Sequence, residues 1–150
     1  MSLNKKVTDS LKEAMKSKDS QALEALRAIR SELLLAQTQT GNKEELSETE
    51  EIKLLQKLVK QRKDSAAIYE EQGRNDLAEP ELAQAKIIEK FLPEQLDDAE
   101  VEEIVAEIVQ QTGASSMADM GKIMGLANAK IAGRADGKTV ANAVKKKLSS

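Results

Sequence analysis

The chain has 150 residues and a formal net charge of −3, with no cysteine, no histidine and only 1% aromatic residues. It therefore lacks a disulfide, a thiol nucleophile, a thiolate metal site and the usual proton shuttle at neutral pH. Its apolar runs are too short to cross a membrane or to form a signal peptide. Because Ala, Leu, Glu and Lys dominate, we expect an all-α protein. The lack of a membrane span and of a signal peptide predicts a cytoplasmic protein that does not bind a membrane, and we expect neither a cofactor nor a metal.

Apolar spacing predicts two helices at the start of the chain. The first has apolar residues four positions apart, at Leu3, Val7, Leu11 and Met15. The second has an apolar face from Leu23 to Leu33. Its pattern is lost in the polar segment QTQTGN, which predicts a loop at 37–42.

The third and fourth helices are predicted from their end signals. SETE at 47–50 has the spacing of a capping box and opens the third helix, which Gly73 ends. The fourth contains Pro80, so it begins either close to this proline or earlier, with Asn75 as its cap and a kink. The fourth helix must end near Phe91, before the next proline.

The stiff segment FLPEQL at 91–96 is the predicted domain boundary. It separates an N-terminal four-helix domain at 1–92 from a C-terminal three-helix domain at 93–150. No internal repeat stands out in either.

Three helices are predicted in the second domain. Asp97 and Glu100 have capping-box spacing and open the fifth helix, which Gly113 ends. The sixth begins in the segment SSMADM and ends at Gly133. Asp136 or its neighbour caps the seventh.

Charge is separated along this second domain. Residues 93–116 contain seven acidic residues and no basic one, whereas residues 117–150 contain seven basic and two acidic residues. The helix macrodipole accounts for the lysines at 145–147. It does not account for four basic residues that flank glycines: Lys122, Lys130, Arg134 and Lys138. They are candidate RNA-phosphate contacts, because glycine lets an anion approach the backbone; the alternative is an ordinary solvated face.

The four glycines of this basic segment have structural explanations as well. Gly121 and Gly125 lie four residues apart on one helix face, where small residues favour close packing against another helix. Gly133 and Gly137 are expected to form a helix end and a turn.

Several motifs resemble the GatB/YqeY family: KQRKDS, GRNDL, FLPEQL, GASSMADMGKIMG and GRADGKTVANAVKKKL, in this order. The resemblance covers essentially the whole chain. It implies a two-domain helical protein related to the tail domain of the B subunit of the glutamine-dependent tRNA amidotransferase, which helps to hold tRNA. The family label of a carbon–nitrogen ligase that uses glutamine as amide donor would then describe a partner enzyme, since the catalytic machinery lies in a separate domain.

Our leading hypothesis is a non-catalytic accessory protein that binds tRNA or another structured RNA by shape and phosphate, because few aromatic residues are present to stack on bases. The main alternative is an adaptor that docks on an amidotransferase or an aminoacyl-tRNA synthetase, with methionines at 117, 120 and 124 as its surface. A DNA-binding helix-turn-helix in AKIAGRADGKTVANAV is disfavoured by its long turn. An enzyme would need a cleft, for which the candidates are Arg62, Asp64 and Arg74.

Overall fold

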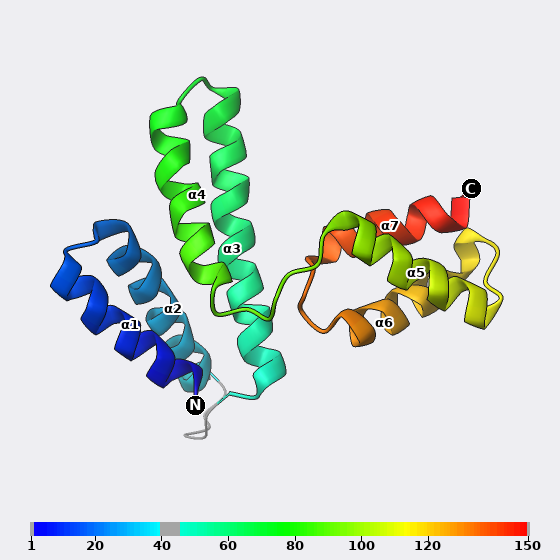
Figure 1. Cartoon of the computed structure of the whole chain (residues 1–150), viewed down its shortest axis with the longest axis horizontal. Helices are drawn as coiled ribbons and strands as arrows, with labels where there is room; N and C mark the ends of the chain where they lie inside the picture. The colour runs from blue at the N-terminus through cyan, green and yellow to red at the C-terminus, as the bar shows by residue number, and fades with distance from the viewer. Residues whose placement is uncertain (1, 40–45, 150) are drawn as a thin grey trace. The chain divides into compact units, whose positions relative to one another are not determined.

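The computed structural model describes residues 2–39 and 46–149, and within them it contains seven α-helices, one short 3-10 helix and no strand (Figure 1). The predicted all-α fold is confirmed. The elements are α1 (Leu3–Ser17), α2 (Ser20–Gln39), α3 (Glu48–Glu71), α4 (Asn75–Glu89), α5 (Asp98–Thr112), η1 (Met117–Asp119), α6 (Met120–Ile131) and α7 (Gly137–Ser149). Within the described residues, no helix combines the length and apolar character needed for a bilayer crossing.

The chain forms two compact units, Met1–Leu92 and Pro93–Ser150. In the first unit, α1 pairs with α2 and α3 pairs with α4, and the two hairpins meet where α2 packs against α4 and α3 (Figure 1). In the second unit, α5, α6 and α7 pack against one another in all three combinations. Each unit has its own core of aliphatic side chains.

The apolar spacing of α1 identifies its core except at Met15, which is 54% exposed. Ala14 is buried in its place, beside Leu3, Val7 and Leu11. A helix advances about 100° per residue, so three steps of four residues rotate the fourth position about 120° from the first. The prediction for Met15 was wrong because this drift takes its side chain out of the core.

The third and fourth helices begin and end close to the expected residues. Ser47 accepts a hydrogen bond from the Glu50 N–H at 3.2 Å, as predicted for a cap. Its hydroxyl donates to the Glu50 carboxylate at 3.0 Å, so this pair lacks the second half of a capping box. Gly73 follows the end of α3 with a φ of +72°, and Pro80 lies inside α4, which begins at Asn75.

The prediction of a loop at 37–42 was wrong for residues 37–39, because α2 continues to Gln39. Residues 40–42 of that loop lie outside the described part of the chain.

The FLPEQL segment is bound to the turn between α6 and α7, a contact that the sequence did not predict. The Leu96 N–H donates to the Arg134 carbonyl at 2.7 Å. The Gln95 side-chain amide donates to the Gly133 carbonyl at 3.1 Å and to the Pro93 carbonyl at 2.8 Å. These bonds hold the start of the second unit against residues 38 positions later in the chain.

Helix ends in the second unit follow the sequence signals closely. Asp97 and Glu100 form a complete capping box, and Gly113 ends α5 in the left-handed region. Asp136 accepts from the Thr139 N–H at 2.7 Å, which confirms it as the cap of α7. The sixth helix is preceded by the 3-10 turn η1, and Ala132 adopts a positive φ just before Gly133.

One buried polar side chain, Gln84, joins the two hairpins of the first unit. It is 7% exposed and lies on α4. Its carbonyl accepts from Arg62 Nε at 3.1 Å, and its amide donates to Gln21 at 3.0 Å and to Glu24 at 2.8 Å. This network therefore links α2, α3 and α4 at the junction of the two hairpins.

Replacing Gln84 should test how much this network stabilises the first unit. Gln84→Ala removes three hydrogen bonds that join the buried Gln84 to part-buried or exposed partners on α2 and α3, so we expect the free energy of unfolding to fall by about 1–2 kcal/mol. Urea denaturation followed by circular dichroism measures this. Gln61→Ala, an exposed change on α3, is the control and should have almost no effect. Equal effects of the two changes would contradict the role of the network.

Candidate nucleic-acid interface

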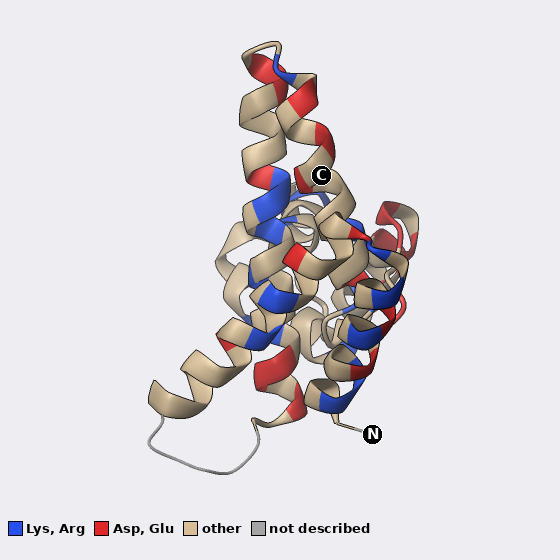
Figure 2. Cartoon of the chain, turned by 90° about the vertical axis from the view of Figure 1, so that its left-hand side faces the viewer, with Lys and Arg blue, Asp and Glu red and all other residues tan. Residues whose placement is uncertain are grey.

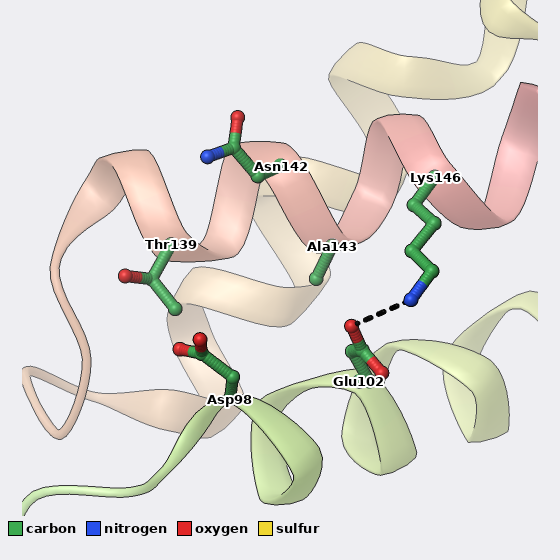
Figure 3. A pocket seen from close by; sticks show the side chains of 6 residues that line it. All are labelled: Asp98, Glu102, Thr139, Asn142, Ala143 and Lys146. Carbon is green, nitrogen blue, oxygen red and sulfur yellow. Dashed lines mark hydrogen bonds and ion pairs between the residues drawn. The ribbon is translucent and has the colours of Figure 1, made fainter.

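A polar groove lies between α5 and α7 of the second unit (Figure 3). Asp98 and Glu102 line it from α5, and α7 contributes Thr139, Asn142, Ala143 and Lys146. The groove continues along the same two helices past Ala99, Glu103, Ala106 and Lys147. One wall is therefore acidic, and the opposite wall carries the hydroxyl of Thr139 and the ammonium group of Lys146, whereas the Asn142 amide points away from α5 (Figure 3).

Two ion pairs connect the acidic helix α5 to the basic helices α6 and α7. Lys146 Nζ lies 3.1 Å from Glu102 Oε1, across the groove (Figure 3). Lys130 Nζ lies 3.4 Å from Glu107 Oε2. Charges that are separated along the sequence are thus neighbours in space. Both pairs are exposed to solvent, so each contributes little stability.

The four predicted RNA contacts occupy different settings. Lys122 and Lys138 are exposed, and neither side chain has an interaction within the described residues. Lys130 is paired with Glu107. Arg134 turns back on its own chain, where its guanidinium donates to the Ile131 carbonyl at 3.0 Å and to the Lys130 carbonyl at 3.2 Å. It therefore satisfies carbonyl groups at the end of α6 that lack helical partners.

Sequence reasoning named Lys138 but did not join it with Lys145 in a row of polar side chains on the outward face of α7. Val140, Val144 and Leu148 are buried, which fixes the rotation of the helix. Lys138, Asn142 and Lys145 consequently share the exposed side, because positions i, i+4 and i+7 lie on one face. The helix dipole is thus an incomplete explanation of Lys145. In the sequence, the spacing of seven residues between Lys138 and Lys145 was the signal that both lie on one face of the helix.

The three candidates for an enzymatic cleft lie along the α3–α4 hairpin. Arg62 belongs to the Gln84 network and also donates to the Leu58 carbonyl at 3.1 Å. Asp64 accepts from Lys60 at 2.8 Å on the exposed side of α3. Residues two positions apart on a helix point about 200° apart, so Arg62 and Asp64 face different directions.

Arg74 lies in the short connection between α3 and α4. Its guanidinium makes two hydrogen bonds of 3.0 Å to the Asp76 carboxylate. These bonds lower the pKa of Asp76 and raise the pKa of Arg74. Arg74 follows Arg62 by twelve positions, beyond the end of α3, so the three candidates do not meet at one place. Basic and acidic residues are interspersed over the helices of this unit (Figure 2).

Gly121 and Gly125 do not pack closely against another helix, so that prediction was wrong. Both are exposed on α6, and a Cβ atom added at either position would have no neighbour within 4 Å. Nothing within the described residues requires a glycine there. In the exposed interior of a helix, glycine costs up to about 1 kcal/mol relative to alanine.

Gly125→Ala should therefore stabilise the second unit by about 0.5–1 kcal/mol, because alanine loses less backbone entropy on folding. Thermal denaturation measures the change. Gly113→Ala is the matched control: it also has open space, but its φ of +71° is strained for alanine. That change should destabilise the protein by about 1–2 kcal/mol. A loss of stability in Gly125→Ala would contradict this account.

Replacing Arg74 should raise the pKa of Asp76, because its guanidinium is the main cause of the low value. A depressed carboxyl pKa stabilises the fold above the pKa of the unfolded chain, and this contribution is lost as pH falls through the folded pKa. Arg74→Ala should reduce that loss on acidification. NMR titration of the Asp76 carboxyl measures the pKa, with Lys60→Ala as the control. A pKa that stays low in Arg74→Ala would assign the effect to backbone N–H groups instead.

Comparison with known proteins supports the resemblance seen in the sequence. A protein of Thermococcus gammatolerans that is named as a component of glutamyl-tRNA(Gln) amidotransferase is 40% identical over 84 residues, which are 53% of this chain and 13% of that relative. The mitochondrial protein of Clavispora lusitaniae named altered inheritance of mitochondria protein 41 is 39% identical over 94 residues, which are 63% of this chain and 53% of that protein. The chain thus spans a small part of the first relative and about half of the second.

A family model covers far more of the chain than either relative does. The model described as Yqey-like protein matches residues 4–148. This match includes all seven described helices except the first residue of α1 and the last residue of α7. The chain belongs to the YqeY-like protein family.

Proposed function

We propose that this protein is a non-catalytic accessory module that binds structured RNA, most specifically tRNA, through the basic helices of its second unit. The observation that carries the proposal is the set of exposed lysines on α6 and α7 whose side chains have no partner within the described residues: Lys122, Lys138 and Lys145. An unpaired ammonium group can bind phosphate without first giving up another interaction.

The relatives support the same proposal. One matched protein is named as a component of a glutamyl-tRNA(Gln) amidotransferase, and this chain aligns with 13% of it. In our proposal the chain supplies RNA contacts, whereas amide transfer belongs to a partner enzyme. The division into a four-helix and a three-helix domain is part of the proposal, with the RNA contacts in the latter.

An adaptor that docks on an amidotransferase or an aminoacyl-tRNA synthetase is the second candidate. Met117, predicted to contribute to such a surface, is 46% exposed, and Leu126 on α6 is 43% exposed. Met120 and Met124 instead pack against the core of the second unit. The methionine surface is therefore smaller than expected. The cytoplasmic location remains a prediction, because one matched relative is named as mitochondrial.

A tRNA titration at two salt concentrations tests the proposed function. The unmodified chain should bind at low salt and lose affinity steeply as salt rises, because phosphate contacts release counterions. The double change Lys122→Gln and Lys138→Gln should weaken binding and lower the slope of log affinity against log salt by about 0.7–0.9 per lost contact. Fluorescence anisotropy with labelled tRNA measures both quantities.

Two exposed lysines of the first unit provide the control. Lys12→Gln with Lys57→Gln changes net charge by the same amount on α1 and α3. This control should bind almost as the unmodified chain does. Absence of binding at low salt would overturn the proposed function, whereas retained binding to a tRNA-charging enzyme after nuclease treatment would favour the adaptor.

A further inference from the structure

We infer that the outward face of α7 is the main surface for the RNA backbone, and that Glu102 competes with RNA phosphates for Lys146. The inference rests on the proposed function and identifies where the site lies and what limits its affinity. The α7 face is defined here as Lys138, Asn142 and Lys145, with Lys146 at its edge.

The geometry of α7 suits an RNA strand whose phosphate backbone runs along the helix. Lys138 and Lys145 are seven residues apart, so they are separated by about 10 Å along the axis. Asn142 is exposed between them and lines the groove. Its amide can donate to a phosphate oxygen and can either donate to or accept from a ribose hydroxyl. The three side chains therefore offer charge at both ends and hydrogen bonding in the middle.

The other cations of this unit are less available than those of the α7 face. Arg134 is committed to carbonyl groups at the end of α6. Lys130 is paired with Glu107 on α5. Lys122 is exposed near the start of α6, eight residues from Lys130. Within the described residues of this unit, α7 is the only helix with two lysines on one face whose side chains have no partner.

Lys146 adds a cation that changes partner when RNA binds. Its side chain is 72% exposed and that of Glu102 is 47% exposed, so water weakens the attraction between them. A phosphate that approaches Lys146 competes with a carboxylate 3.1 Å away. It also meets the charge of Asp98 and Glu103 on the acidic wall of the groove. The acidic wall therefore limits how tightly the α7 face binds a polyanion.

The first experiment compares matched lysine pairs by tRNA anisotropy titration. Lys138→Gln with Lys145→Gln should weaken binding at low salt at least about tenfold and lower the salt slope by about 1.4–1.8, which corresponds to two lost phosphate contacts. The pair at Lys12 and Lys57 should change affinity less than about threefold. Glutamine keeps a high helix propensity, so both variants should fold, which circular dichroism checks.

The second experiment changes one carboxylate at a time on α5. Glu102→Gln should tighten binding roughly three- to fivefold, because Lys146 loses its competitor. Glu103→Gln removes the same charge from the same helix and lies in the same groove, but Glu103 is not bonded to Lys146. It should tighten binding less than about twofold. Equal effects would mean that only total charge matters and would overturn the competition for Lys146.

The outcomes separate the inference from the proposed function. If the unmodified chain does not bind tRNA at low salt, the proposed function fails. If it binds but the α7 pair behaves like the control pair, the proposed function stands and the assignment of the α7 face as the main RNA surface is wrong. A loss in the α7 pair that is absent from the pair at Lys12 and Lys57, together with a gain specific to Glu102→Gln, supports both parts of the inference.

Discussion

Burial of aliphatic side chains is the interaction on which both units depend. The largest fully buried side chains are all isoleucine, leucine or valine, and they are divided between two separate cores. Full burial of each contributes about 1.5–3 kcal/mol. A unit of roughly 60 residues buries a smaller share of its surface than a larger domain does. In the second unit, hydrogen bonds that join distant segments, such as the bond from Leu96 to Arg134, therefore contribute a larger share of the stability than they would in a larger domain.

Helices and their ends could be predicted well from the sequence, because both depend on neighbours within one or two turns. The cap at Asp97 and the stop at Gly113 are examples. Predictions that required knowledge of the opposing surface were less successful. Spacing alone placed Met15 in the core and made Gly121 and Gly125 packing contacts, whereas all three are exposed. The rotation along α1 accounts for Met15, whereas the exposure of the two glycines depends on which face of α6 its neighbours cover.

The candidate site shows the same division between local and tertiary information. The sequence revealed that acidic and basic residues are separated along the second unit, but it did not reveal that α5 packs against both basic helices. That packing places Glu107 beside Lys130 and Glu102 beside Lys146. Nothing in the sequence indicated that Arg134 would bond to carbonyls at the end of α6. Partners of long charged side chains depend on tertiary packing.

Under the proposed function, the acidic helix α5 would also allow the second unit to discriminate between ways in which a nucleic acid approaches. Residues 93–150 contain seven basic and nine acidic residues, so the unit does not attract a polyanion by net charge alone. Under the proposed function, a phosphate backbone would gain affinity only if it followed the exposed lysines of α7 and avoided the carboxylates of α5. Exposed ion pairs contribute only about 0–1 kcal/mol, so exchange of Glu102 for a phosphate at Lys146 costs little. If the second unit binds RNA as we propose, orientation of the backbone, rather than total charge, would decide how a nucleic acid binds.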